Sequence, residues 1–415
     1  MSGIVKTLAA TALLGTTLAF AGGASAETVT VFHDKPFYQE GWDGLTAAAK
    51  EAGIDLQFSA YTTDQFQAFI QQGLMSGSPP DAFTWWNGTK LAEVVESGMI
   101  APLDELWAKK IESGEYDASA AEPFKVGDHI YGMPTGINRW VVFYNKALFE
   151  KAGIDGTPAT WEELMADAEK LRAAGITPFN ATLQEGWRGF IWFEELLIRT
   201  DADAYDKLNK GEIKYTDPAV QRVFEIWGDL YSKGYFTDPA SQEEQLDFAR
   251  GKAAMYLAGD WNIGLIEAAG LKPGDDFGVF IMPNVDPEDE NVIIVEGGPL
   301  VISTAGAEKP EVMEFADWYM SDKAMNAWAT SPGLYAGNNK AKIPNVLIGE
   351  IAKAAADGNY KSITRYWEAS PSDIVLPAVE EMNRFMTTPT PEQAKAAMEN
   401  MEAVASQYWA ANPQE

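Results

Sequence analysis

The stretch TVTVFHDKPFYQEGWDGLTAAAKEAGIDLQFSAYTTDQFQAFIQQGLMSGSPPDAFT, residues 28–84, decides the fold. Short runs rich in β-branched and aromatic residues alternate here with longer segments of helical periodicity that end at Gly or Pro. The pattern predicts strand, helix, strand, helix and strand at residues 28–32, 38–52, 54–58, 64–75 and 81–84. This alternation favours parallel pairing through right-handed crossovers, so the sequence predicts an α/β fold.

Polar and aromatic side chains follow directly after each of these three strands. The carboxyl ends of parallel strands meet at one edge of a sheet, where α/β proteins bind ligands. Adjacent residues on a strand point in opposite directions, so we expect one of the two neighbouring tryptophans to face the site and the other to pack. We expect His33 to be a hydrogen-bonding residue of this rim rather than a metal ligand. The candidate binding residues are Asp34, Lys35, Tyr61, Trp85, Trp86 and Asn87.

The second half of the chain repeats this logic. Predicted strands at residues 177–182, 253–257 and 292–295 lead into segments that carry charged, aromatic or glycine residues. The glycine pair before a further strand at 300–303 indicates a hinge or a close approach of backbones. The candidates in these segments are Glu185, Trp187, Arg188, Asp260, Trp261, Gly297 and Gly298.

Helix signals are clear in two other regions. Thr160 and Glu163 form a capping box, which predicts that a helix begins there and continues to Gly175. After about residue 310 the chain is mainly helical in pattern. The predicted helices are residues 310–320, 322–329, 341–357, 374–386 and 391–408.

The first 26 residues have the pattern of a secretion signal. Lys6 precedes an apolar run at residues 8–20, and Ala24-Ser25-Ala26 offers a cleavage site for signal peptidase. The run is short for a membrane anchor. The chain has no cysteine, which a lipid-anchored exported protein would need at its cleavage site. We therefore expect cleavage after Ala26 and release into the periplasm.

Composition excludes several classes of function. The formal net charge of −30 repels phosphate backbones and anionic lipids, so nucleic acids and membrane surfaces are poor partners. With two histidines and no cysteine, common metal sites and nucleophile–base pairs are hard to assemble. Phosphate-binding and dinucleotide-binding glycine motifs are absent. We expect no metal, no cofactor and no catalytic residue.

The candidate residues combine indole rings with carboxylates and amides, which is the chemistry of sugar binding. A pyranose ring lies flat against an indole, and its hydroxyl groups form strong hydrogen bonds with charged side chains. Polyamines or polyols are alternatives, since they use similar groups. A secreted glycoside hydrolase would need two carboxylates across one sugar bond, for which Glu185 and Asp260 are the candidates. A structural or adhesive surface protein is a third possibility.

Several motifs together resemble the extracellular solute-binding proteins of family 1, the sugar-binding subunits of ABC importers, which include the maltose-binding proteins. The resemblance extends over essentially the whole mature chain. The motifs are Tyr131-Gly-Met-Pro134, Phe143-Tyr-Asn-Lys-Ala-Leu-Phe149, Pro80-Asp81, Thr160-Trp161-Glu162, Gly251-Lys-Ala-Ala-Met255 and Gly259-Asp260-Trp261.

The resemblance implies a type II periplasmic binding protein fold, in which two α/β lobes are joined by a hinge and enclose the ligand. It implies lobes of residues 27–137 with 299–345 and of residues 138–298 with 346–415, after a signal peptide of residues 1–26. It also implies a likeness to known cleft positions at Asp34, Lys35, Trp85, Glu185, Trp187 and Trp261. Departures from the family pattern at Asn138 and near Trp367 speak against maltose itself. Arg139 and Arg188 serve either ligand hydroxyl groups or nearby acids.

The same resemblance implies a mode of action and a set of partners. The ligand would be a neutral sugar that stabilises the closed lobes, and the closed form would be recognised by the membrane permease of an ABC importer. We expect a monomer that is not an enzyme and helical structure at its C-terminal end.

Overall fold

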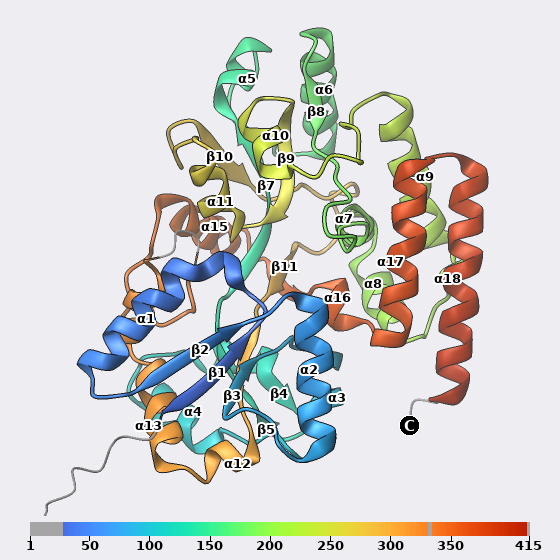
Figure 1. The fold of residues 1–415 in the computed structure, drawn as a ribbon. Helices are drawn as coiled ribbons and strands as arrows, with labels where there is room; N and C mark the ends of the chain where they lie inside the picture. Colours follow the sequence, from blue (N-terminus) through green and yellow to red (C-terminus); the bar gives the residue numbers. More distant parts are fainter. Residues whose placement is uncertain (1–27, 331–333, 413–415) are drawn as a thin grey trace, which may run out of the picture.

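The computed structural model describes residues 28–330 and 334–412. The predicted signal peptide, residues 1–26, lies outside the described residues. Two α/β lobes are present, each built on its own sheet and stacked one above the other in Figure 1. The α/β class predicted from residues 28–84 is therefore confirmed.

The first lobe contains a five-stranded sheet with the order β2-β1-β3-β12-β6. The three early strands pair in parallel, as the alternation of strands and helices predicts. Strand β12 runs antiparallel to both β3 and β6, so a late segment of the chain is inserted between two early ones. The strands are β1 (Val29–His33), β2 (Leu56–Ala60), β3 (Ala82–Thr84), β6 (Gly132–Pro134) and β12 (Pro299–Ile302).

The second lobe is built around β7, which pairs antiparallel with β9, β10 and β11. The order is β13-β11-β7-β9-β8, with β10 paired to β7 beside this path. The strands are β7 (Asn138–Asn145), β8 (Thr177–Phe179), β9 (Ala253–Gly259), β10 (Phe277–Phe280), β11 (Val292–Glu296) and β13 (Lys361–Thr364). A separate hairpin joins β4 (Lys125–Val126) to β5 (His129–Ile130).

Helices cover both sheets. Those that pack on the first sheet are α1 (Gln39–Glu51), α2 (Thr63–Ser76), α3 (Thr89–Val95), α4 (Asp104–Glu112), α12 (Thr304–Ala307), α13 (Pro310–Tyr319) and α14 (Asp322–Trp328), with the 3-10 turns η1 (Pro36–Tyr38) and η2 (Ala118–Phe124). Those of the second lobe are α5 (Lys146–Lys151), α6 (Trp161–Ala173), α7 (Phe190–Thr200), α8 (Ala202–Asn209), α9 (Pro218–Ser232), α10 (Glu244–Ala249), α11 (Asn262–Ala268), α15 (Val346–Asp357), α16 (Tyr366–Ala369), α17 (Ser372–Thr387) and α18 (Pro391–Ala411).

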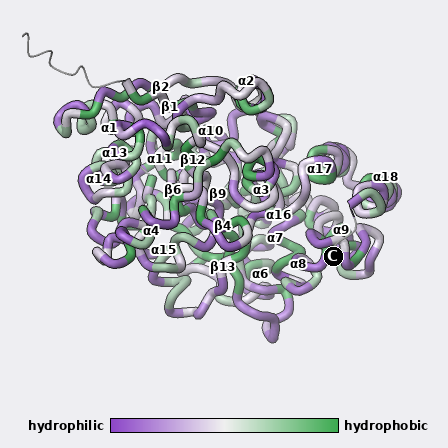
Figure 2. The backbone as a smooth tube through the Cα atoms, turned by 90° about the horizontal axis from the view of Figure 1, so that it is seen from below, coloured by the Kyte–Doolittle hydropathy of each residue, from purple (hydrophilic) through white to green (hydrophobic). Residues whose placement is uncertain are grey.

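Each sheet has its own hydrophobic core. Val31, Phe83 and Trp42 are buried in the first core, whereas Val142 and Trp227 are buried in the second. Figure 2 shows hydrophobic segments concentrated toward the middle of the molecule and hydrophilic segments around its edge. Two separate cores mean that the chain folds as two bodies rather than around one common core.

Three segments connect the two cores. The first joins β6 to β7, the second joins β11 to β12, and the third lies between Ala341, which packs on the first core, and Leu347, which is buried in the second. The first two are bonded together, since the backbone N–H and the hydroxyl of Thr135 both donate to the Gly298 carbonyl, at 3.0 and 2.7 Å. At Gly297 a Cβ would lie 2.5 Å from the Gly136 carbonyl oxygen, so only glycine fits this crossing.

Some predicted boundaries are wrong. The helix expected from Ala341 begins at Val346, because Pro344 interrupts the segment and the Asn345 side chain accepts a bond from the Ile348 N–H, at 3.1 Å, as an N-cap. The helix start predicted at Thr160 is confirmed, since the Thr160 hydroxyl accepts a bond from the Glu163 N–H, at 3.2 Å. The Glu163 carboxylate accepts the N–H of Ala159 rather than that of Thr160, at 2.7 Å, so the second half of the capping box is displaced by one residue.

Candidate ligand-binding cleft

A cleft of about 380 Å³ lies where the two lobes face each other. The predicted candidates that line it are Asp34, Lys35, Trp86, Asn138, Glu185, Trp187, Arg188, Trp261, Gly297, Gly298 and Trp367. These residues come from both lobes and from the crossing segments between them. The structure therefore brings together side chains that are more than three hundred positions apart in the sequence, such as Asp34 and Trp367.

Five predicted candidates do not line this cleft. Trp85 is buried and its indole N–H donates to the Lys90 carbonyl, at 2.9 Å, so Trp86 faces the cleft while Trp85 packs. Tyr61 stacks on Phe69, with ring centres 5.2 Å apart. The other candidates outside the lining are Asn87, Arg139 and Asp260.

His33 is a buried core residue rather than the rim residue that we expected. Its ring stacks on Trp42 at 4.3 Å and its Nδ1 accepts the backbone N–H of Lys35, at 3.1 Å. Burial lowers the pKa of His33 to about 4, against the charge of Asp34, so the ring is neutral near pH 7. His33 shapes the turn after β1 and thereby orients Asp34 and Lys35.

Asp34 and Lys35 form the polar wall that the first strand contributes. Their charged groups lie 3.3 Å apart, and an Asp34 oxygen also accepts the Thr84 hydroxyl of β3, at 3.0 Å. The ends of β1 and β3 therefore fix this carboxylate. Both contacts use Oδ1, so the Asp34 carboxylate retains capacity to accept further hydrogen bonds.

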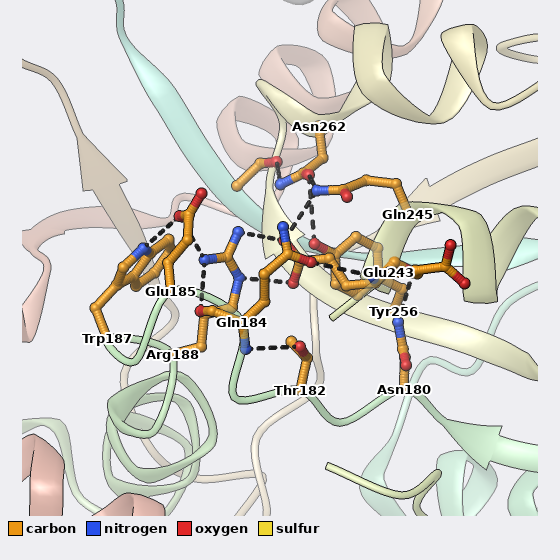
Figure 3. Close-up of polar contacts among 12 residues, drawn as sticks. Asn180, Thr182, Gln184, Glu185, Trp187, Arg188, Glu243, Gln245, Tyr256 and Asn262 are labelled. Carbon is orange, nitrogen blue, oxygen red and sulfur yellow. Dashed lines mark hydrogen bonds and ion pairs between the residues drawn. The ribbon is translucent and has the colours of Figure 1, made fainter. Parts of the chain in front are cut away.

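The second lobe contributes a cluster around Arg188, which Figure 3 shows. One Glu185 oxygen accepts both the Trp187 indole N–H and an Arg188 N–H, each at 3.0 Å. Burial would raise the pKa of Glu185, but the charge of Arg188 and these two bonds lower it overall. The Arg188 guanidinium also pairs with Glu244 and lies 4.1 Å from the centre of the Trp187 ring.

The backbone at Glu185 explains how the cluster is placed. Glu185 has φ of +59°, a left-handed conformation that is uncommon outside glycine, and Gly186 follows at +76°. This tight turn lies directly before α7 and presents Glu185, Trp187 and Arg188 on one side. The loop is therefore held in a costly conformation at the site.

A second ionic cluster closes the cleft near the crossings. Arg365 pairs with Glu296, the last residue of β11, and donates through Nε to Glu368, at 2.8 Å. Burial would lower the pKa of Arg365, but the charges of Glu296 and Glu368 raise it, so the guanidinium stays charged. The Trp261 indole hydrogen-bonds to Glu296. A Cβ at position 259 would lie 2.4 Å from that indole nitrogen, so Gly259 provides the space for Trp261.

The lining also includes residues that sequence reasoning did not select. They are Tyr38, Thr135, Gly136, Gln184, Gln245, Leu265, Glu296, Leu334, Arg365 and Glu368. Signals existed for some of them, because Glu296 directly precedes the glycine pair, and Arg365 and Glu368 flank Trp367. No sequence signal marked Tyr38 or Leu334 as a lining residue, since each resembles an ordinary core residue.

In the described ranges 28–330 and 334–412, no group of three His, Asp or Glu side chains could hold a metal ion. In the same ranges, no helix has both the length and the apolar character that crossing a membrane requires.

The arrangement of two lobes around one cleft is that of a solute receptor. Residues 35–326 match the family model of bacterial extracellular solute-binding proteins, and the chain belongs to this family. The resemblance inferred from the sequence motifs is therefore confirmed.

Three relatives show how much of the chain is similar to other binding proteins. An uncharacterized ABC transporter extracellular-binding protein of Pyrococcus horikoshii is 31% identical over 52% of this chain and 49% of its own length. The alpha-glucosides-binding periplasmic protein of Rhizobium meliloti is 31% identical over 45% of this chain and 43% of its own. The sn-glycerol-3-phosphate-binding periplasmic protein of Yersinia pestis is 26% identical over 58% of each. The chain thus matches about half the length of these relatives.

Solved structures share the fold. A chitin oligosaccharide binding protein superposes with a TM-score of 0.78 at 21% identity, covering 92% of this chain and 99% of that one. A bacterial solute receptor with an exclusive preference for β-D-galactopyranose gives 0.78 at 22% identity, with the same coverage. The two-lobed type II binding-protein fold is therefore established for this chain.

Proposed function

We propose that this protein captures a neutral sugar, a mono- or short oligosaccharide, in the inter-lobe cleft and delivers it to the permease of an ABC importer. The lobes comprise residues 27–137 with 299–345 and residues 138–298 with 346–415. The protein acts as a monomer in the periplasm after cleavage behind Ala26. Contacts from both lobes to one ligand favour the closed form, because a ligand shifts such an equilibrium only by its differential affinity for the two states.

The aromatic lining supports a ring-shaped ligand with an apolar face. Four tryptophans line the cleft: Trp86, Trp187, Trp261 and Trp367. Carboxylates lie beside them at Asp34, Glu185, Glu296 and Glu368. Indole planes pack against the C–H faces of a sugar, while carboxylates accept its hydroxyl protons in charge-assisted bonds.

The observation that carries the proposal is that every cation lining the cleft already has a carboxylate partner. Lys35 pairs with Asp34, Arg188 with Glu185 and Glu244, and Arg365 with Glu296 and Glu368. A phosphate or carboxylate ligand would compete with these carboxylates, and to leave one of the buried ones, Asp34, Glu244, Glu296 or Glu368, without its partner costs several kcal/mol. This argues against an anionic ligand, although one relative is named for glycerol phosphate.

The indole rings argue equally against a cationic ligand such as a polyamine. The Arg188 guanidinium lies 4.1 Å from the Trp187 ring centre, and the Lys90 ammonium lies 5.1 Å from that of Trp367. The protein thus already places its own cations against these rings, where a ligand cation would otherwise gain cation–π energy. An uncharged ring with several hydroxyl groups is compatible with both the paired cations and the occupied indole rings.

The glycoside hydrolase alternative loses the carboxylate pair that the sequence nominated for it. Asp260 does not line the cleft, so Glu185 and Asp260 do not flank one ligand there. Incubation with nitrophenyl glycosides should release no nitrophenol.

The experiment that tests the proposal is a calorimetric titration with charged and uncharged solutes. Maltose, galactose, raffinose and chitobiose would be compared with sn-glycerol 3-phosphate and spermidine. We expect at least one neutral sugar to bind and both charged solutes to fail. Trp187→Ala and Trp261→Ala should each weaken the binding of that sugar by about 2–4 kcal/mol, the loss typical of a central aromatic anchor.

The matched control is Trp409→Ala, which removes a half-buried indole on α18 that does not line the cleft. The affinity of this variant for the sugar should equal that of the unmodified protein. Binding of the phosphate or the polyamine with no binding of any sugar would overturn the proposal. So would full affinity in both cleft variants.

A further inference from the structure

Lys90 is a buried lysine with unusual partners. It lies on α3 with 2% of its surface exposed, and no carboxylate of the described residues lies within ion-pair distance of it. A buried ammonium needs compensating contacts. Its Nζ donates to the Ser372 hydroxyl, at 2.8 Å, and lies 5.1 Å from the ring centre of Trp367 and 6.0 Å from that of Trp86. Burial lowers the pKa of Lys90, against the charges of Glu93 and Glu368.

These partners belong to different lobes. Trp86 is buried in the first core, as is the helix that carries Lys90, whereas Trp367 and Ser372 lie on α16 and α17 of the second lobe. The ammonium therefore lies between two cleft-lining indoles that come from opposite sides. A cation within about 6 Å of an indole ring centre is attracted to the ring, and the attraction is stronger when the cation is desolvated.

Other contacts beside Lys90 join the same two lobes, and together with those of Lys90 we call them the junction. The Thr89 hydroxyl lies 3.0 Å from the carbonyl oxygens of both Glu368 and Ser370. The Ser372 hydroxyl, which accepts from Lys90, donates to a Glu93 oxygen at 3.1 Å. A Cβ on Gly88 would lie 2.2 Å from the Glu368 carbonyl oxygen, so the two backbones touch. Helix α3 thus docks its first turn onto the segment between α16 and α17.

The partners of Lys90 differ from those of Lys110, another buried lysine. Lys110 is also buried, on α4 of the first lobe, but its ammonium lies 3.4 Å from Glu115 and 3.3 Å from Asp317. Both carboxylates belong to its own lobe. Lys110 therefore stabilises one body, while Lys90 joins two.

We propose that Lys90 is a positioning residue that joins the lobes at this end of the cleft and holds Trp86 and Trp367 in the orientation in which they line it. Assigning the two indoles to a ligand rests on the proposed function, but the junction itself does not. All of its contacts are made by protein groups, so it favours closure before any ligand binds.

The absence of cysteine allows a clean test. Cysteines introduced at exposed Glu51 and Lys151, one on each lobe, would carry spin labels for pulsed distance measurements without ligand. Lys90→Met removes the charge at similar volume and should shift the ratio of closed to open protein at least tenfold toward open. Lys90→Arg keeps the charge and should restore most of the closed fraction. Ser372→Ala should cause a smaller shift in the same direction.

The matched control is Lys110→Met, which should lower the melting temperature but leave the distance distribution unchanged. If Lys90→Met fails to fold, Ser372→Ala carries the test. An unchanged distribution in Lys90→Met, or in Ser372→Ala where that variant carries the test, would overturn the proposal. So would equal opening in Lys90→Met and Lys90→Arg. No sugar enters this measurement, so a protein that fails every titration but opens in Lys90→Met would contradict the proposed function alone.

Discussion

Asp260 shows that a single residue can lower the stability of the fold in a way that the sequence does not reveal. It is 1% exposed, and neither carboxylate oxygen has a hydrogen-bonding side-chain partner among the described residues. Burial raises the pKa of Asp260 to about 8, against the charge of Arg139. The sequence placed Asp260 beside a ligand because it follows a strand, but that pattern does not distinguish a lining residue from one that the next helix covers.

This shift makes stability depend on pH. The folded protein holds a proton on Asp260 up to about pH 8, whereas the unfolded chain releases it near pH 4, so this residue destabilises the fold progressively between those values. Asp260→Asn should therefore raise the free energy of unfolding at pH 8 by about 2–5 kcal/mol and change it much less at pH 4. Urea unfolding at both pH values measures this. Exposed Asp275→Asn should show no such difference, and a gain that is equal at both pH values would contradict the assignment.

Other cleft residues show which part of the site was predictable. Trp187 and Trp261, which line the cleft, were selected because each follows a predicted strand. Alternation predicted that one of Trp85 and Trp86 faces the site, but it did not tell which one. Arg365 and Glu296 were missed as a pair, since only the folded chain brings β11 and the residue after β13 together. Contacts between distant segments are not encoded in any local pattern.

At the scale of elements, strands that lead into polar or aromatic segments were predicted, such as β1, β3 and β9, whereas β7 and β13 were not. Strand β13 is partly exposed and polar, and the middle of β7, residues 140–144, is a short apolar run, which periodicity alone cannot distinguish from a buried helix. The parallel pairing of the first three strands could be predicted because helices alternate with them along the chain. The antiparallel insertion of β12 could not be predicted, because it depends on pairing with a strand more than two hundred residues away.

The helix that begins after Thr160 offers a test at this scale. The Thr160 hydroxyl accepts the Glu163 N–H, while a Glu163 oxygen accepts the Ala159 N–H, at 2.7 Å. Thr160→Ala should lower the free energy of unfolding by about 1 kcal/mol, because one N–H of the first turn loses its acceptor. Thr160→Ser should retain most of the stability in the same chemical denaturation. Equal losses in both variants would mean that the methyl group, not the cap, matters.

At the scale of the whole molecule, the charge of −30 is the dominant feature. Like charges repel in the compact state, and salt screens them by shortening the Debye length from about 30 Å at 0.01 M to about 10 Å at 0.1 M. The melting temperature should therefore rise over this range of sodium chloride. Potassium chloride should have the same effect, since screening depends on ionic strength. A fall in melting temperature, or a strong difference between the two salts, would contradict this account.

The position of β12 between β3 and β6 has a consequence for biosynthesis. As the chain emerges from the ribosome, the early strands cannot complete their sheet until Ile302 has been made. Until then β3 and β6 each present an open edge, and the nascent polypeptide must be kept from pairing with its neighbours. The sheet of the first lobe therefore stays incomplete for most of the translation of the chain, which is compatible with the export that we propose.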